Sequence, residues 1–269
     1  MGAILAHRGS LGRPPARIGR IAKGSQEKGM FKEPDRRRIY LMRHGEAAYL
    51  REDGTVVDDT RVVPLTPFGR DQAHRQAELL AGVEFDRAVC SGLPRTRETA
   101  GIVLRGRDGP TLEIVEPLEE IQGGDRHEPE DLGAWIQHIA NPWADAAKPG
   151  ARFIGGELFS DFSDRVIPAF QALVAQQDWR CLLLVLHGGV NRLLLNHVMN
   201  LPLGGTLTVE QDTCCINIID LDMEDGAVVR YLVRAINITG YNLSKAGIHL
   251  TDMERAAKRM AAQISSRPE

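Results

Sequence analysis

The sequence predicts an α/β fold, a three-layer sandwich in which a central, mostly parallel sheet is covered by helices on both faces. Two observations predict it. From Arg38 onward, short apolar runs of strand length alternate with longer segments in which apolar residues recur at helical spacing. One of the short runs, Cys181–Leu186, is apolar at every position, which is typical of a parallel strand that is buried on both faces.

The elements of the first half follow from short local signals. The apolar run Ile39–Met42 predicts the first strand. Thr66 and Pro67 mark a helix start, because threonine caps a first turn and proline fits it, and this helix is expected to reach Leu80. The remaining elements are a strand at 87–90, a helix at 93–104 and a short strand at 112–115.

The second half is expected to alternate in the same way. A helix is expected to begin at Pro129, and a long amphipathic helix is expected at 157–177, where Pro168 should kink or loosen one turn. The remaining elements are the strand at 181–186, a helix at 190–199, an antiparallel hairpin at 216–221 and 228–233, and a helix near 251–264.

Composition limits the class of protein and its surroundings. The 269 residues suit one large domain with an extension, and the formal net charge of -3 gives no bias toward nucleic acid. No apolar stretch is long enough to predict a membrane-spanning helix. The four cysteines, two of them adjacent, form neither a disulfide framework nor a zinc pattern, so reduced thiols and a cytoplasmic location are expected.

Residues 1–36 are expected to form a basic, disordered extension that precedes a catalytic domain at 37–269. Residues 1–26 contain arginine and lysine but no aspartate or glutamate, and no apolar segment there suits a secretory signal. A transit peptide and a true translation start at Met30 are the two alternatives.

Polar residues follow three of the predicted strands. They are Arg43–Glu46 after the first strand, Ser91–Ala100 after the second and His187–Val190 after the central one, with Glu119 and Glu120 between the last two. Ligands of α/β sheets bind beyond the carboxyl ends of the strands, where these segments are expected to meet. The sequence therefore predicts one pocket that collects two histidines, arginines and a carboxylate.

The run Leu41-Met42-Arg43-His44-Gly45-Glu46 resembles the signature of the histidine phosphatase superfamily, also called phosphoglycerate mutase-like. Five further segments resemble the family's motifs in the family's order: 65–73, Ser91–Ala100, Leu118–Ile121, Gly155–Glu157 with Arg165, and Leu186–Val190. The resemblance covers residues 38–236. It implies a metal-independent phosphatase that hydrolyses phosphate monoesters through a phosphohistidine intermediate.

The phosphate-binding residues are expected to be Arg43, Arg95, His187 and the backbone near Gly188, together with the nucleophile His44. Charge spreads over three oxygens in the transition state of phosphoryl transfer, so catalysis depends on positioning and electrostatics. The planar fork of arginine matches two phosphate oxygens, and backbone N–H groups at a helix start add donors.

The nucleophile is expected to be His44, held neutral by nearby cations, while a protonated His187 stabilises the transferring oxygens. The choice of His44 over His187 rests on the resemblance, because spacing alone does not separate them. Glu120 is expected to protonate the leaving oxygen and later to accept a proton from water. Glu119 is the alternative acid; the family's acid stands just before an apolar position, which favours Glu120.

The sequence departs from the family pattern at two places. Gly92 stands where an aspartate is common, and the apolar segment Ala47–Leu50 stands where a small polar residue, often asparagine, is common. The loop that follows passes the expected pocket, so Arg51 and Arg61 are hypothesised to help select the substrate; the alternative is that both are solvated.

No metal and no cofactor are expected, since Asp53, Asp58 and Asp59 lack the pattern of a calcium loop. The expected partner is a small phosphate monoester or a phosphoprotein, with no nucleic acid and no membrane; the sequence does not indicate an oligomeric state.

Two other functions compete with hydrolysis. The first is a phosphoglycerate mutase-type phosphoryl transfer; dedicated mutases carry a longer insertion after the acid motif, whereas here only residues 121–186 separate Glu120 from His187. The second is a non-catalytic module that binds a phosphorylated ligand. All five chemical positions are present, which favours an enzyme, and trapping of a phosphohistidine would separate the two classes.

Overall fold

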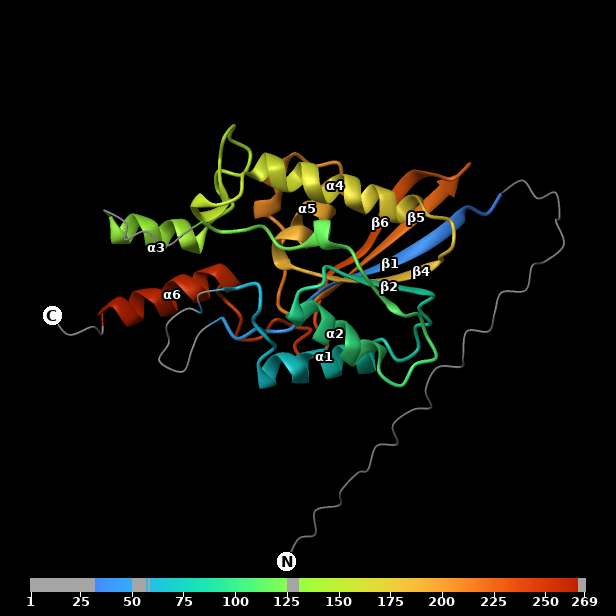
Figure 1. Cartoon of the computed structure of the whole chain (residues 1–269), viewed down its shortest axis with the longest axis horizontal. Helices are drawn as coiled ribbons and strands as arrows, with labels where there is room; N and C mark the ends of the chain where they lie inside the picture. Colours follow the sequence, from blue (N-terminus) through green and yellow to red (C-terminus); the bar gives the residue numbers. More distant parts are fainter. Residues whose placement is uncertain (1–31, 50–56, 58, 125–130, 266–269) are drawn as a thin grey trace, which may run out of the picture. The chain divides into compact units, whose positions relative to one another are not determined.

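The computed structural model describes residues 32–49, 57, 59–124 and 131–265 (Figure 1). Residues Pro34–Glu269 form one structural unit. The predicted extension at 1–36 lies almost entirely outside the described residues, and it stays a prediction. No helix in the described part of the chain is long and apolar enough to cross a membrane.

A six-stranded sheet forms the centre of this unit, with the strand order β3-β2-β4-β1-β5-β6. The first four strands in this order are parallel, and β5 and β6 are antiparallel, as the sequence predicted. The strands are β1 (Asp35–Arg43), β2 (Arg87–Cys90), β3 (Leu112–Ile114), β4 (Cys181–Leu186), β5 (Ile216–Glu224) and β6 (Ala227–Ile238).

Strand β1 begins at Asp35, ahead of the predicted domain boundary at residue 37. Its first residues pair with β5, and the Arg36 guanidinium donates to the Asp222 carboxylate over 2.7 Å and 3.1 Å. Because of this pairing, the polar residues at the start of β1 belong to the strand. An apolar pattern alone does not predict them as part of it.

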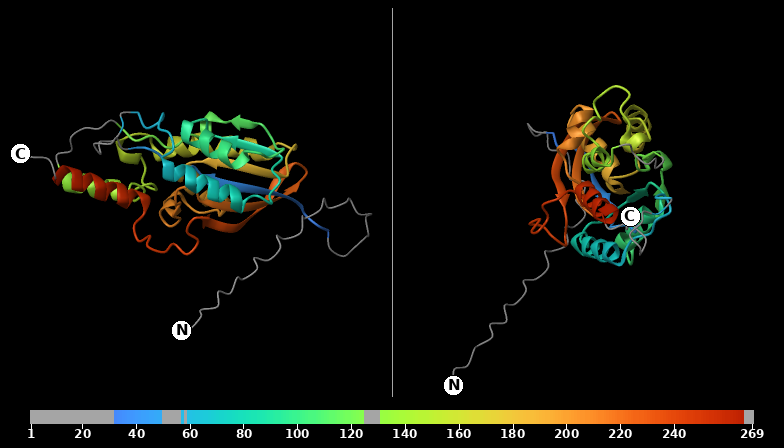
Figure 2. Two further views of the ribbon diagram at one scale, coloured as in Figure 1. Left: turned by 90° about the horizontal axis from the view of Figure 1, so that it is seen from below. Right: turned by 90° about the vertical axis from the view of Figure 1, so that its left-hand side faces the viewer.

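Helices cover both faces of the sheet (Figure 1). The pair α1 (Pro67–Leu79) and α2 (Pro94–Leu104) covers one face, and the pair α4 (Phe159–Ala175) and α5 (Gly188–Val198) covers the other. Helices α3 (Leu132–Ala140) and α6 (Asp252–Ser265) pack against each other beyond the carboxyl edge of the parallel strands (Figure 2). Three 3-10 turns complete the fold: Glu116–Leu118, Phe153–Gly155 and Leu203–Leu207.

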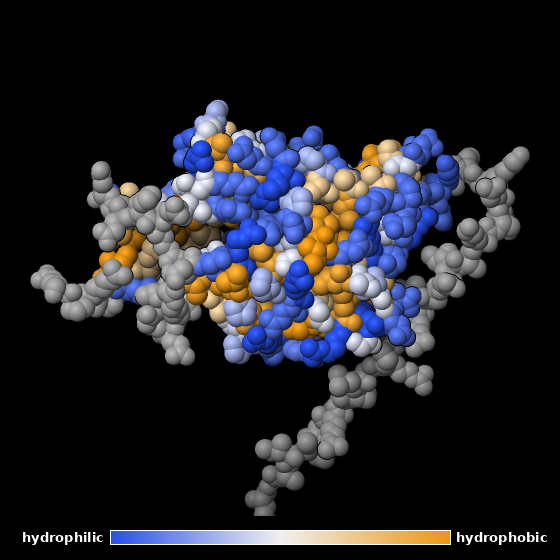
Figure 3. Space-filling model, viewed as in Figure 1, coloured by the Kyte–Doolittle hydropathy of each residue, from blue (hydrophilic) through white to orange (hydrophobic). Residues whose placement is uncertain are grey.

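The alternation of β1 divides the interior into two apolar cores. Ile39 and Leu41 pack among the side chains beneath α4 and α5, while Tyr40 and Met42 pack beneath α1 and α2. Hydrophilic side chains cover most of the face shown in Figure 3, with apolar side chains between them. The three-layer prediction is therefore confirmed.

Most helix starts agree with the sequence, and two differ. Thr66 caps α1 by accepting a hydrogen bond from the Gly69 N–H over 2.9 Å, as predicted. Helix α3 begins at Leu132, because the Asp131 carboxylate caps it by accepting from Ala134 N over 2.9 Å; the predicted start at Pro129 lies outside the described residues.

Helix α5 is the second case: it begins at Gly188, before the predicted residue 190, directly after the cap residue His187. The helix start thus places backbone N–H groups immediately beside the second histidine, and this positions the site.

Candidate active site

Three neighbouring parallel strands end beside one another and bring the predicted site residues together. Cα pairs join Arg43 to Leu186 and Cys90 to Val185, so the residues that follow β1, β2 and β4 share one edge. The imidazole rings of His44 and His187 lie there with centroids 5.2 Å apart. The predicted pocket therefore exists as a cluster of side chains.

His44 is only 1% exposed, and its hydrogen bonds define its tautomer. Its Nδ1 lies 2.7 Å from the Gly45 carbonyl oxygen, which can only accept, so Nδ1 carries the proton. The Arg95 Nε–H points at Nε2 over 3.2 Å, which leaves a lone pair on that nitrogen. Burial, then the charges of Arg95 and Arg43, hold the pKa of His44 well below its usual range.

His187 is fully buried and begins a chain of hydroxyl groups. Its Nε2 lies 2.7 Å from the Ser91 oxygen, which lies 3.1 Å from the Thr96 hydroxyl, and Thr96 donates to the Leu93 carbonyl over 2.8 Å. The Nδ1 atom of His187 has no hydrogen-bond partner among the described residues. It is therefore available to a ligand.

The protonation of His187 that is expected during phosphoryl transfer stays a prediction. Burial, followed by the charges of Arg95, His44 and Arg43, holds the pKa of His187 well below its usual range. A further contribution comes from the charge of Arg165. An incoming phosphate dianion supplies the missing negative charge, so protonation belongs to the complex.

The two predicted clamp arginines are fixed by different parts of the chain. Arg95 is 3% exposed; its Nη1 donates to the Thr60 carbonyl over 2.9 Å, and its guanidinium lies 5.6 Å from the Tyr49 ring centroid. Arg43 donates from Nη1 to the Gln211 carbonyl over 2.5 Å.

The Nη1 atom of Arg43 also forms an ion pair with Asp252. A Cβ at Gly188 would lie 3.2 Å from the Arg43 Nε, which shows how closely the helix start approaches this guanidinium.

The two candidate acids have different binding partners. The Glu120 carboxylate accepts from the backbone N–H groups of Gly189 and Val190 over 3.1 Å and 3.3 Å, at the start of α5. Glu119 instead pairs with Arg61 over 2.6 Å. Glu120 thus lies beside the second histidine motif, while Glu119 is bound to a half-exposed arginine.

A salt bridge behind these acids holds their segment. The Arg165 guanidinium binds the Glu157 carboxylate through two hydrogen bonds of 3.1 Å and 3.0 Å and also donates to the carbonyls of Pro117 and Glu119. The Glu157 carboxylate in turn accepts from Gln122 N over 3.1 Å. Helix α4 therefore fixes both ends of the acid segment.

One of the two departures from the family pattern, Gly92, has a local explanation. Gly92 has a φ of +99°, and a Cβ there would lie 2.7 Å from the Ile114 side chain, so only glycine fits. Arg61 reaches Glu119 as described. Arg51, Asp53 and Asp58 lie outside the described residues.

Three residues at the site were not assigned a role by sequence reasoning. Ser91 lies within a quoted motif, but its contact with His187 needs the sheet order. Tyr49 lies in the apolar stretch after the first motif. The third, Asp252, comes from α6; the pattern Thr251-x-x-Glu254 signals a helix start there, yet nothing local links it to Arg43.

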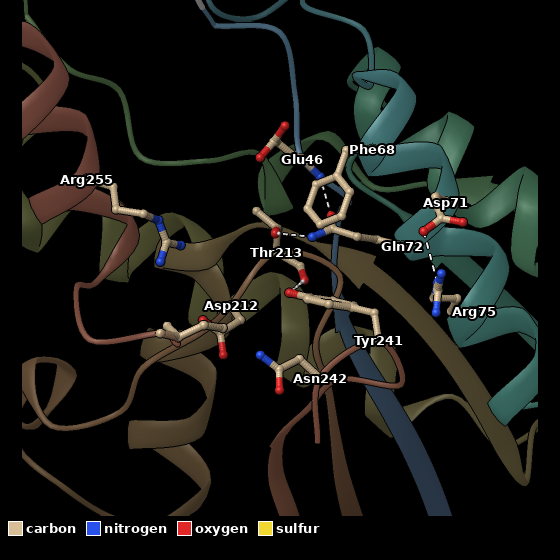
Figure 4. Close-up of a pocket in the computed structure, with 11 residues that line it drawn as sticks. Glu46, Phe68, Asp71, Gln72, Arg75, Asp212, Thr213, Tyr241, Asn242 and Arg255 are labelled. Carbon is tan, nitrogen blue, oxygen red and sulfur yellow. Dashed lines mark hydrogen bonds and ion pairs between the residues drawn. The ribbon is translucent and has the colours of Figure 1, made fainter. Parts of the chain in front are cut away.

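A cleft of about 430 Å³ lies beside this cluster (Figure 4). Glu46 lies on its wall, where Gln72 accepts from the Glu46 N–H and donates to Thr213, each over 2.9 Å. Arg255 lines the opposite side and pairs with Asp252, the partner of Arg43. None of the five predicted catalytic side chains lines this cleft; it adjoins the arginine clamp through α6.

No three His, Cys, Asp or Glu side chains gather to hold a metal ion in the part of the chain that the structure describes. The cations that face the two histidines are the arginines named above.

Comparison with known proteins agrees with this geometry. The family model of the histidine phosphatase superfamily (branch 1) matches residues 39–234. The chain is 32% identical over 211 residues to an adenosylcobalamin/α-ribazole phosphatase of Escherichia coli, covering 75% of this chain and 98% of that protein. It is 29% identical over 188 residues to a 2,3-bisphosphoglycerate-dependent phosphoglycerate mutase of Rhizobium etli, covering 65% and 86%.

A solved structure gives the same result. The crystal structure of the α-ribazole phosphatase from Shigella flexneri superposes with a TM-score of 0.58 at 29% sequence identity, covering 74% of this chain and 96% of that one. Because the family model spans most of the chain and the family's motifs meet at one edge of the sheet, this protein belongs to branch 1 of the histidine phosphatase superfamily.

Proposed function

We propose that this enzyme hydrolyses phosphate monoesters through a phosphohistidine at His44, without a metal ion. The observation that supports the choice of nucleophile is the tautomer of His44: Nδ1 donates to the Gly45 carbonyl, and the unprotonated Nε2 accepts a hydrogen bond from the Arg95 Nε–H, so its lone pair faces the clamp. His187 Nδ1 has no such partner in the described residues, so it suits a donor to phosphate better than a nucleophile.

In the first step, His44 Nε2 attacks phosphorus, a P–N bond forms and the ester P–O bond breaks. Glu120 gives its proton to the leaving oxygen, which departs as an alcohol. Arg43, Arg95 and the protonated His187 balance the charge on the equatorial oxygens. The backbone N–H groups at the start of α5 hold the Glu120 carboxylate beside them.

In the second step, Glu120 takes a proton from water while the water oxygen attacks phosphorus. The P–N bond breaks, inorganic phosphate leaves and His44 returns to its neutral tautomer. In a mutase, a second phosphorylatable alcohol would take the place of this water.

We propose a small-molecule monoester as the substrate, with an α-ribazole phosphate as the first candidate. The relatives named as α-ribazole phosphatases support this candidate, with one from Escherichia coli matched over nearly its whole length. The relative named as a phosphoglycerate mutase keeps transfer to a phosphoglycerate as the second candidate.

A cytoplasmic location, the lack of a nucleic-acid partner and the division at residues 1–36 stay predictions. The four cysteines are all free thiols, which supports a reducing compartment.

The test is phosphate release in EDTA from a panel of monoesters that includes α-ribazole phosphate and 3-phosphoglycerate. Wild-type protein should release phosphate and form an acid-labile, base-stable phosphoryl adduct; His44→Ala should do neither. His74→Ala, on the exposed side of α1, is the matched control and should behave as wild type. An adduct without phosphate release would point to a mutase, and neither adduct nor release to a binding module.

A further inference from the structure

The carboxylate of Asp252, the first residue of α6, bridges two guanidinium groups. It forms ion pairs with Arg43 at the clamp and with Arg255 one turn along its own helix. The Asp252 side chain is 20% exposed and that of Arg43 is 14% exposed, so this contact lies at the boundary between the site and solvent.

This contact consumes hydrogen-bond donors of the clamp. The Nη1 atom of Arg43 has two N–H bonds, of which one is directed to the Gln211 carbonyl and the other to Asp252. While Asp252 is bound, Nη1 offers nothing to a phosphate. A carboxylate oxygen and a phosphate oxygen make the same charge-assisted bond to a guanidinium, so they compete for Nη1, whereas the Arg43 Nε has no partner among the described residues.

The two anions also repel each other. A phosphoryl dianion on Arg43 would lie next to the Asp252 carboxylate, and like charges so close together disfavour the ionised pair. Arg255 can keep its bond to Asp252 when the Arg43 bond breaks, because both residues belong to α6. When a phosphoryl group displaces Asp252 from Arg43, the Asp252 carboxylate therefore still has Arg255 as a cationic partner.

Helix α6 has its main packing contact with α3 and is joined to β6 by an irregular segment. It packs mainly against α3, and Ala257 is the residue that it buries. The segment between β6 and α6 is irregular; Leu243 there is 69% exposed and Lys245 has a φ of +57°. The family model ends at residue 234, so α6 lies outside the matched fold.

From these contacts we infer that Asp252 is an internal competing ligand for Arg43, which sets the affinity of the clamp for phosphoryl groups. Binding of a phosphoryl dianion displaces the carboxylate and moves the first turn of α6 away from the clamp. The inference rests on the proposed function only in that Arg43 binds the phosphoryl group.

The first experiment measures the binding of inorganic phosphate by calorimetry to the wild type and to Asp252→Asn, which keeps the side-chain shape without the charge. The variant should bind phosphate roughly two- to fivefold more tightly, the range of a partly exposed ion pair. Asp145→Asn, which removes an exposed carboxylate paired with Lys148, is the matched control and should leave the affinity unchanged. Equal or weaker binding by Asp252→Asn overturns the inference and makes Asp252 a group that positions Arg43.

The second experiment follows amide hydrogen exchange in α6. Saturating phosphate should accelerate exchange at 252–265 in the wild type, and Asp252→Asn should show this faster exchange without phosphate. Unchanged exchange at α6 overturns the displacement.

The outcomes also separate this inference from the proposed function. Tighter binding by the variant in a protein that hydrolyses no monoester refutes the function alone. Hydrolysis with identical phosphate affinities refutes the inference alone. A wild type that binds no phosphate refutes both, because Arg43 would then have no phosphoryl ligand.

Discussion

Ser91 links the protonation of His187 to the rest of the site. In the neutral state of His187, the Ser91 hydroxyl can donate to Nε2. In the protonated state, Nε2–H donates to Ser91, Ser91 to Thr96 and Thr96 to the Leu93 carbonyl, so every hydrogen bond points the same way. Rotation of the Ser91 hydroxyl therefore keeps Nε2 paired in both states, while the hydrogen bond from Ser91 to Thr96 forms only in the protonated one.

Ser91→Ala removes the acceptor for Nε2–H and should lower the pKa of His187 in the enzyme–phosphate complex. Activity needs the protonated form there, so the alkaline limb of the kcat profile should move to lower pH by about one unit. Ser91→Thr retains the hydroxyl and should restore the wild-type profile. An equal loss of kcat at every pH in Ser91→Ala would contradict this role.

Substrates with different leaving groups can show whether Glu120 or Glu119 is the catalytic acid. Glu120→Gln should lower kcat for an alkyl phosphate by about 100-fold or more, because the alkoxide needs a proton. p-Nitrophenyl phosphate has a stable leaving anion and should lose far less in the first step. Glu119→Gln should behave like wild type with both substrates; the reverse pattern would assign the acid to Glu119.

At the scale of elements, helix α4 positions an acid to which it is not adjacent in sequence. Arg165 and Glu157 near its start bind the backbone of the segment between β3 and α4. The part of that segment at 115–124 contains no regular element except a 3-10 turn, so its geometry depends on these bonds. The position of Glu120 is consequently set by the α4 start.

Arg165→Met should lower kcat for an alkyl phosphate by about tenfold, while p-nitrophenyl phosphate turnover changes by less than about twofold. Its thermal midpoint should be compared with that of Arg152→Met, which replaces a nearby arginine that donates to the Gly156 carbonyl. If both substrates lose activity equally, Arg165 supports the fold and has no specific effect on the acid.

The elements were predictable where local chemistry decides them. Thr66-Pro67 marks the start of α1, which ends at Leu79, one residue before its predicted end, and the apolar run at 181–186 marks β4 with the bounds that the structure has. The strands β5 and β6 extend beyond their predicted ends at residues 221 and 233, where Asp222 of β5 pairs with Arg230 and Arg234 of β6 pairs with Asp220. An apolar pattern predicts that a strand ends at such residues, but charged residues that pair across the sheet continue the strand.

The site was predictable for residues within motifs and not for contacts between distant segments. Arg43, His44, Arg95, Glu120 and His187 gather at the predicted edge, while their catalytic roles stay predictions. The contact of Asp252 with Arg43 joins the two ends of the unit, and no local signal specifies it. The lowered pKa of His187 also depends on burial, which only the assembled fold shows.

At the scale of the whole molecule, the buried histidines make stability depend on pH. The pKa values of His44 and His187 are lowered in the folded state, so unfolding lets each bind a proton below its ordinary pKa of 6.5. The free energy of unfolding should therefore fall as pH drops from 6.5 toward 5, by about 1.4 kcal/mol per pH unit for each histidine.

This loss can be measured by urea unfolding in phosphate-free buffer, with His44→Gln for comparison. The variant should show a shallower pH slope over that window, since it has one fewer group to protonate. The Asp222 carboxylate, whose pKa is lowered to about 2 by Arg36, loses its contribution only at far lower pH. If the free energy of unfolding had the same pH slope in both proteins, the assignment of a lowered pKa to His44 would be refuted.

The place of β4 between β1 and β2 has a consequence for biosynthesis. The strand at 181–186 is made long after its two neighbours, so they cannot take their final positions until most of the chain has left the ribosome. The two imidazoles meet only after that insertion, and a nascent or prematurely terminated chain that lacks it has no reactive pocket. The order of synthesis thus delays assembly of the pocket until the domain is nearly whole.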